Sequence, residues 1–235
     1  MDFEVSLKNA FYKNGTKVLT DTSRVTLLNA NGEPLGSASM DEFVRKVAAT
    51  LTSPDDYVDL GLPSGLLWGT KNIGATSPTG WGWYFSWGNI DGHPEGSGYN
   101  FSQDVYNATD AASISQDLDV SQDAVRAIKG GTWRMPTQYD FAELFNSDYT
   151  TNEWTTVDGV NGRKVTSKIN GKSVFFPAAG YYNGTSLSNR GSNGSYWSSS
   201  WVSAALARLL SFNSSSVNPQ PSSGRRYGFS LRGVM

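Results

Sequence analysis

The C-terminal stretch Tyr196–Met235 limits the possible folds more than any other part of the sequence. It contains no Asp, Glu or Lys, its only charged residues are arginines, and its serines and small apolar residues alternate with aromatic residues. Helices with an exposed face usually carry charged residues of both signs, so this composition disfavours a helical surface. Serine-rich sequence with bulky residues interspersed is typical of a binding surface of strands and loops on a rigid scaffold. We expect the rest of the chain to provide that scaffold.

The composition excludes several classes of function. A chain of 235 residues fits one large domain, or one domain with a small additional unit. The absence of cysteine excludes disulfides, thiolate metal sites and a cysteine nucleophile. The 25 glycines, 8 tryptophans and 17% charged residues indicate a β-rich fold with many loops. The net charge of -2 disfavours a general nucleic-acid-binding protein.

No targeting or membrane segment is visible. The chain begins with acidic residues, and its first apolar run is too short for the core of a signal peptide. No run approaches the ~20 apolar residues that cross a bilayer. We therefore expect synthesis in the cytoplasm and no membrane insertion.

Residues 1–53 form the first predicted unit. Alternating apolar residues and the turn signals Asn14-Gly15 and Asn31-Gly32 predict short strands. Ser39 is then expected to cap an amphipathic helix that ends near Leu51. Such a unit is too small for a sizeable core, so we expect it to attach or oligomerise the chain.

Residues 54–235 form the second predicted unit, an α+β domain with two short helices. Ser121 is expected to cap the helix Gln122–Lys129, which is followed by two glycines. Thr137 is expected to cap the helix Gln138–Phe145.

Strands surround these helices. Two are predicted around a turn at Pro63–Gly65. Later hairpins are predicted at Asp158-Gly159, Asn161-Gly162 and Asn170-Gly171, and Asn183–Gly194 is predicted to be a polar loop.

An aromatic loop covers residues 81–101. Many rings separated by glycines predict irregular loops wrapped over a core, since aromatic residues in loops are more often buried than stacked on a ligand. The alternative is a platform for stacking sugars. The rings are Trp81, Trp83, Tyr84, Phe85, Trp87, Tyr99 and Phe101.

Catalytic and metal-binding patterns are weak. His93 is the only histidine, and it lies in a Gly/Pro loop. Asp140 and Glu143 share a helix face, but carboxylates on a helix surface are usually solvated. Calcium requires six to eight oxygen ligands, and the C-terminal stretch has no carboxylate side chain. The sequence therefore predicts a binding protein without catalytic residues, metal or cofactor.

A series of motifs in fixed order resembles a large family of C-type-lectin-fold domains, which is related in fold to formylglycine-generating enzymes. The resemblance runs from about Tyr57 to the last residue. The motifs that carry it are Asp59–Trp68, Trp133–Thr137, Phe176–Tyr181, Tyr196–Ser200 and Gly228–Arg232. It implies a C-type lectin fold with twisted antiparallel sheets.

Within that family, Tyr196–Met235 looks like the variable region of target proteins of diversity-generating retroelements. In those systems a reverse transcriptase randomises adenines, and asparagine codons become codons for many residues, but not for Lys, Glu, Gln, Met or Trp. Twelve positions carry residues reachable in this way and form the implied ligand-binding surface, here called the variable set. They are Val202, Ser203, Leu206, Arg208, Leu209, Ser211, Ser214, Pro221, Ser222, Ser223, Gly224 and Arg226.

Between these positions stand residues that look like a fixed frame. They are Trp197, Ala207, Leu210, Phe212, Val217, Pro219, Arg225, Gly228 and Phe229. Removing a large side chain from a core costs about 2–5 kcal/mol, whereas surface changes usually stay within about 0.5 kcal/mol. Diversity is therefore expected only at outward positions of a stiff fold.

The chain departs from the neighbouring families. Formylglycine-generating enzymes work through cysteines, which are missing, so their activity cannot be carried over. Calcium-dependent lectins carry a sequence triplet that contains a carboxylate. The most similar segment of this chain, Asn218–Pro221, has no carboxylate side chain.

The resemblance implies a receptor-binding component of a phage tail, carried in the virion. Its partner would be a host or bacterial cell-surface protein or glycan, and residues 1–53 would assemble the chain, with a trimer as the expected state. A bacterial cell-surface or cytoplasmic protein is the alternative location. The alternative function is a carbohydrate-binding or carbohydrate-active domain that uses the aromatic loop 81–101.

Overall fold

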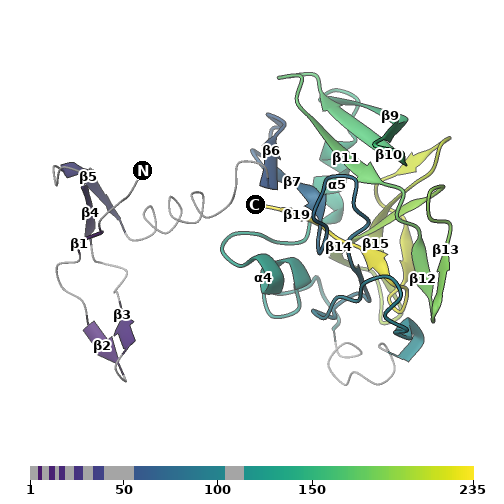
Figure 1. Ribbon diagram of the computed structural model, residues 1–235, viewed down its shortest axis with the longest axis horizontal. Helices are drawn as coiled ribbons and strands as arrows, with labels where there is room; N and C mark the ends of the chain where they lie inside the picture. Colours follow the sequence, from purple (N-terminus) through teal and green to yellow (C-terminus); the bar gives the residue numbers. More distant parts are fainter. Residues whose placement is uncertain are drawn as a thin grey trace. The chain divides into compact units, whose positions relative to one another are not determined.

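The computed structural model describes residues 56–103 and 114–235 in full, together with the backbone of five short strands before residue 40 (Figure 1). The chain divides into two units, Met1–Ser53 and Pro54–Met235. Among the described residues, no helix has both the length and the apolar character needed to cross a membrane.

The strands of the first unit form a small antiparallel sheet and a separate hairpin. The sheet has the order β1-β4-β5, and β2 pairs with β3. The register pairs Lys13 with Thr16, which confirms the hairpin expected around Asn14-Gly15. Ser39 is the last residue of β5, and the helix predicted after it lies outside the described residues. The strands are β1 (Val5–Ser6), β2 (Phe11–Lys13), β3 (Thr16–Val18), β4 (Arg24–Leu28) and β5 (Pro34–Ser39).

The described residues of the second unit are mostly β-sheet with two short α-helices, which confirms the α+β class. The largest sheet has the order β16-β15-β14-β18-β8, and β17 also pairs with β15. Apart from β8, all of its strands come from Gly194–Ser230, so the serine-rich stretch builds the central sheet as well as a surface. The strands are β8 (Tyr84–Phe85), β14 (Gly194–Trp201), β15 (Leu206–Phe212), β16 (Val217–Asn218), β17 (Ser222–Gly224) and β18 (Phe229–Ser230).

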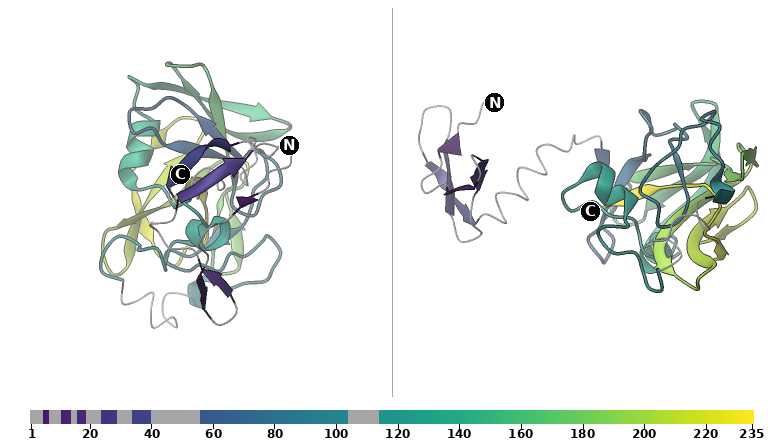
Figure 2. Two further views of the ribbon diagram at one scale, coloured as in Figure 1. Left: turned by 90° about the vertical axis from the view of Figure 1, so that its left-hand side faces the viewer. Right: turned by 90° about the horizontal axis from the view of Figure 1, so that it is seen from below.

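Three smaller sheets surround the central one. Their orders are β19-β7-β6, β11-β10-β9 and β12-β13. Strand β19 brings the C-terminus beside β7, near the beginning of the unit (Figures 1 and 2). The strands are β6 (Tyr57–Asp59), β7 (Leu67–Asn72), β9 (Thr150–Val157), β10 (Val160–Ser167), β11 (Ser173–Pro177), β12 (Tyr181–Asn183), β13 (Ser186–Ser188) and β19 (Arg232–Val234).

The hairpin β14–β15 is buried on both faces. Because side chains alternate along a strand, Tyr196 and Leu210 point to one side and Trp197 and Leu209 to the other. The first pair packs in a core cluster with Trp68, Phe141 and Phe176. The second pair packs in a cluster with Trp87, Trp133 and Phe229. This two-sided burial explains why the frame residues of the hairpin are bulky.

Buried Arg232 ties several sheets together. Its Nη1 donates to the carbonyl of Gly69 at 2.8 Å, and its Nη2 donates to Asn72 Oδ1 at 2.6 Å and to the carbonyl of Phe175 at 2.9 Å. Asn72 in turn donates to the hydroxyl of Tyr196 in β14 at 3.1 Å. None of the described carboxylates forms an ion pair with Arg232, so backbone carbonyls and an amide compensate its charge.

Burial shifts the pKa values of this network without changing its charge at neutral pH. It lowers the pKa of Arg232 to about 10 and raises the pKa of Tyr196 to about 12. The guanidinium therefore stays protonated and the phenol stays neutral, the states in which they make these hydrogen bonds.

The helices confirm one predicted cap and correct the other. Helix α5 (Gln138–Leu144) starts at Thr137 with a capping box to Asp140, as predicted. Helix α4 (Ala124–Lys129) is capped by Asp123, so the prediction of Ser121 is wrong. Ser121 instead donates to Asp119 at 2.6 Å.

Asp123 is the cap because its carboxylate accepts hydrogen bonds from two separate segments of the chain. Its Oδ1 accepts from the backbone N–H of Arg126, and its Oδ2 accepts from that of Met135 at 2.8 Å. Burial raises the pKa of this carboxyl, against the opposing effect of these hydrogen bonds.

Two turn predictions also need correction. Hairpins form at Asp158-Gly159 and Asn170-Gly171, but Asn161 and Gly162 lie inside β10. A side chain at Gly162 would meet the Phe175 ring and the Phe176 carbonyl, so glycine is there for close packing. The predicted polar loop Asn183–Gly194 contains the hairpin partner β13.

A conservative change at Arg232 tests the buried network. We expect Arg232→Lys to lower the free energy of unfolding by about 3 kcal/mol or more, because lysine cannot reproduce the fork of hydrogen bonds and leaves buried carbonyls unpaired. Denaturant unfolding measures this, with the exposed Arg226→Lys as the control at under about 0.5 kcal/mol. Equal stability of the two variants would contradict the role given to Arg232.

Candidate ligand-binding site

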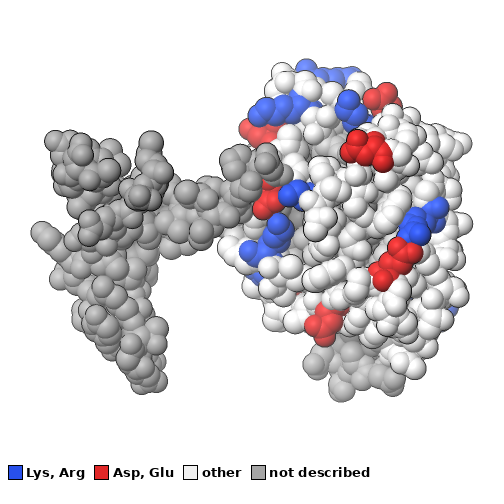
Figure 3. Space-filling model, viewed as in Figure 1, with Lys and Arg blue, Asp and Glu red and all other residues white. Residues whose placement is uncertain are grey.

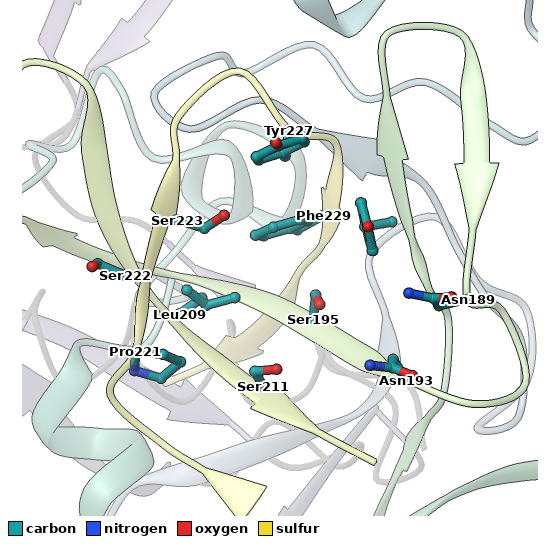
Figure 4. A pocket seen from close by; sticks show the side chains of 11 residues that line it. Asn189, Asn193, Ser195, Leu209, Ser211, Pro221, Ser222, Ser223, Tyr227 and Phe229 are labelled. Atoms are coloured by element: carbon teal, nitrogen blue, oxygen red, sulfur yellow. The ribbon is translucent and has the colours of Figure 1, made fainter.

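A hollow with a volume of about 380 Å³ lies on the central sheet, between the C-terminal strands and the loop that precedes β14 (Figure 4). Its base is formed by Leu209 and Phe229, which are both almost fully buried. A volume of this order lies in the range of small-molecule sites, roughly 300–1,000 Å³. The hollow is therefore the first candidate for a binding site.

Serines from neighbouring strands line the hollow. Ser195 and Ser211 are directly paired across β14 and β15, so their side chains lie on the same face. Ser222 and Ser223 come from β17 at the edge of the sheet, next to Pro221. The hydroxyls of Ser195 and Ser211 lie close together in the middle of the view in Figure 4.

Aromatic rings form another wall. The ring of Tyr227 stacks parallel to that of Phe229, with ring centres 5.9 Å apart. Tyr181 of β12 meets both rings edge-on, at 5.8 and 6.0 Å. These edge-to-face and offset contacts are the favourable geometries for aromatic pairs, so the wall is fixed by packing.

The loop before β14 places two asparagines at the rim. Asn189 has a φ of 57°, a left-handed conformation that asparagine tolerates better than most residues. The backbone N–H of Asn193 donates to the carbonyl of Asn189 at 2.9 Å, which closes the turn. Asn161 holds this loop from β10 by donating to the carbonyl of Gly191 at 3.0 Å. The rim is therefore a turn whose conformation is fixed by hydrogen bonds.

The polar side chains of the hollow make no hydrogen bonds within the described part of the chain. This holds for the side chains of Asn189, Asn193, Ser195, Ser211 and Ser223. Ser195 is only 7% exposed as a whole residue, and its side chain borders the hollow. A set of convergent donors and acceptors without internal partners is a feature of binding sites.

The hollow carries no charged side chain among its lining residues. Arg190 lies next to Asn189 in sequence but is paired with Glu95. Arg226 lies over the Tyr227 ring, 5.5 Å from its centre. On the face seen in Figure 3, the charged side chains of the described residues are scattered over a mostly uncharged surface. The hollow is therefore electrostatically suited to an uncharged ligand.

A second groove, with a volume of about 500 Å³, lies on the other side of Tyr227. It is lined by the turn Ala204–Leu206 and by Gly224–Tyr227. Arg225 supports it from below: its Nη1 donates to the carbonyls of Ile114 and Ala204, both at 3.1 Å, and its guanidinium lies 4.5 Å from the centre of the Trp87 ring. A frame residue thus holds the turn that carries exposed members of the variable set.

The variable set is not confined to one face. Leu209, Ser211, Pro221, Ser222 and Ser223 line the hollow, whereas Leu206, Gly224 and Arg226 line the second groove. The rest line neither: Val202 and Ser203 lie in the turn between β14 and β15, Ser214 is exposed in the turn after β15, and Arg208 donates to the carbonyl of Gln220 at 2.9 Å. Arg208 alternates with Leu209 and so points to the opposite side of β15.

Leu209 corrects the prediction that every member of the set points outward. It is only 4% exposed and packs in the core cluster of Trp197 and Phe229. Its side chain reaches the hollow only as part of the base. The frame prediction holds for Trp197, Ala207, Leu210, Phe212, Arg225, Gly228 and Phe229, which are buried, while Val217 and Pro219 are half-buried.

About half of the residues that line the hollow were not predicted from the sequence. Tyr181, Asn189, Asn193, Ser195 and Tyr227 line it but are outside the variable set. The segment 183–194 was recognisable as polar and asparagine-rich, but its position opposite β17 depends on the register of β12 and β14, which the sequence does not reveal.

The aromatic loop 81–101 mainly contributes to the core. Tyr84, Phe85, Trp87 and Phe101 are 1% exposed or less, while Trp81, Trp83 and Tyr99 are half-buried. Trp87 donates from Nε1 to the carbonyl of Ser198 at 2.7 Å. The segment is therefore not all irregular loop as predicted: Tyr84 and Phe85 form β8 of the central sheet, and the other rings lie in loops around it.

The residues considered for catalysis have structural partners. Asp140 closes the capping box and accepts from Arg134 at 2.6 Å. Glu143 accepts from the backbone and hydroxyl of Ser64. His93 stacks on Tyr99 with ring centres 3.3 Å apart. In the described ranges, no three His, Cys, Asp or Glu side chains gather as metal ligands would.

Comparison with known proteins gives no match: no family model, curated protein or solved structure is significantly similar to this chain.

Proposed function

We propose that the chain is a receptor-binding protein that displays a diversified surface on a rigid C-type lectin scaffold, as the target protein of a diversity-generating retroelement. The observation that carries this proposal is the separation within one stretch of sequence: most frame residues are buried, and most residues of the variable set line two surface hollows. We assign the chain to a phage tail, where it would bind a bacterial cell-surface protein or glycan.

The packing of the motifs supports the lectin-fold part of the proposal. The motifs are far apart in sequence, yet their side chains pack together in two core clusters, one on each side of β14. Trp68 contacts Phe176, and Phe176 contacts Tyr196, with ring centres 6.0 and 5.3 Å apart. Trp197 contacts Phe229 at 4.3 Å. The second motif, Trp133–Thr137, joins them through Pro136, whose carbonyl accepts from the backbone N–H of Ser199 at 2.8 Å.

Substitutions cost much more stability at frame positions than at exposed positions of the variable set, so the exposed positions can vary. Truncating a frame ring such as Phe212 would cost about 3–5 kcal/mol, a large part of the stability of a domain. Changes at exposed Ser214 or Ser222 would cost about 0.5 kcal/mol or less. A system that varies only the exposed positions keeps the scaffold folded while it changes the surface.

The size of the surface favours multivalent binding. A standard protein interface uses about 20–30 residues on each side, and the variable set supplies about half of that number. We propose that residues 1–53 assemble the chain into a trimer, which would raise the apparent affinity by up to ~10²–10⁴ without new contacts. Light scattering of the full chain should then give three times the chain mass of 25.5 kDa, whereas a monomer mass would contradict this part.

Binding to bacterial cells tests the location of the site. We expect the labelled full chain to bind some strains of a bacterial panel, and a variant with asparagine at ten positions of the variable set to lose that binding. Leu209 is left unchanged because it is buried, and Gly224 because a side chain would lie 3.3 Å from the Tyr227 ring. The control variant carries asparagine at exposed Thr151 and Tyr139, outside both hollows. Full binding by the ten-position variant would place recognition elsewhere.

The flanking DNA tests the retroelement. We expect a near-copy of the codons for residues 196–235 beside a reverse-transcriptase gene, differing from the coding copy mainly where the copy has adenine. Sequencing of the locus decides this. A locus without such a copy would leave a binding protein with a fixed surface.

A further inference from the structure

We propose that the hollow binds a neutral saccharide of the bacterial surface, without a metal ion. This inference rests on the proposed function and narrows it, because it assigns a ligand class to one of the two hollows. It is carried by the combination of an aromatic wall, serine and asparagine side chains that converge on the hollow without internal hydrogen-bond partners, and a lining without charge.

The aromatic wall matches one side of a sugar ring. A pyranose presents C–H groups on one face, and such a face packs on an aromatic ring. Tyr227 and Tyr181 are half-buried, so part of each ring borders the hollow. The stack of Tyr227 on Phe229 fixes the plane of the wall before any ligand binds. A preformed wall reduces the entropy that binding would otherwise cost.

The polar groups match the edge of a sugar ring, where hydroxyls both donate and accept. The hydroxyls of Ser195 and Ser211 lie side by side on the sheet, and the amides of Asn189 and Asn193 lie at the rim. Each of these groups can donate and accept, as sugar hydroxyls do. Ser195 is the decisive one, because the residue is only 7% exposed, its side chain borders the hollow, and it has no hydrogen-bond partner in the described part of the chain.

The uncharged lining selects against other ligands. A phosphate, a sialic acid or an acidic peptide would need a cation, and none of the lining residues supplies one. A basic ligand would need a carboxylate, and none of the lining residues supplies one. A protein partner would need a contact area of about 800 Å² on each side, far more than a hollow of this size presents.

The experiment uses the full chain on an array of neutral and acidic oligosaccharides, followed by calorimetry with the best neutral one. Ser195→Ala removes only the hydroxyl that borders the hollow and is expected to weaken the Kd about fivefold or more, which is the effect of one lost hydrogen bond. Ser211→Phe fills the hollow and is expected to abolish binding. The matched controls are Ser215→Ala and Ser215→Phe, at an exposed position outside the hollow and outside the variable set, and they should leave the Kd unchanged.

The outcomes separate this inference from the proposed function. If the chain still binds cells while no neutral oligosaccharide binds or competes, the proposal of a saccharide ligand is wrong. The proposal of receptor binding then stands. Binding of acidic oligosaccharides only, or neutral binding that survives both Ser195→Ala and Ser211→Phe, would overturn the assignment of the hollow. Neutral binding that continues in the presence of chelator and is lost in Ser211→Phe supports it.

Discussion

The hydrogen bonds of buried Arg232 hold together strands that are far apart in the sequence. One guanidinium reaches the carbonyls of Gly69 in β7 and Phe175 in β11, and through Asn72 it is linked to Tyr196 in β14. Removing a charge from water is costly, so this arrangement is stable only when each donor finds an acceptor at short distance. The geometry that satisfies Arg232 therefore also fixes how the central sheet sits on its neighbours.

The rigidity of this centre has a consequence for the surface. Since β14 and β15 are buried on both faces, most of their side chains are committed to packing, and variation is left to strand ends, turns and the edge strand β17. Ser211 and Ser222 illustrate the outcome, because they lie within the sheet yet border an open hollow. A surface with these properties can change its contacts while the backbone that carries it stays in place.

Much of the fold was predictable, whereas the site was predictable only in part. Local signals worked where one interaction decides the structure, as at Thr137, whose capping box depends on Asp140 three residues later. They failed where a distant partner decides, as at Asp123, which caps α4 while holding Met135, and at Gly162, which is needed for packing against Phe175. For the same reason Leu209 was wrongly predicted to point outward: both faces of β15 are covered, and the face that carries Leu209 packs against Trp197 and Phe229. The asparagine rim was missed because it depends on which strands pair.

Tyr196–Met235 combines frame positions that do not tolerate substitution with surface positions that do. Saturation mutagenesis of this whole stretch, scored by resistance of the displayed full chain to protease, measures that difference position by position. We expect two separate classes: substitutions at Trp197, Leu209, Phe212 and Arg232 unfold the chain, whereas most substitutions at Ser203, Ser214 and Ser222 are accepted. Equal tolerance at both groups, or equal intolerance, would contradict it.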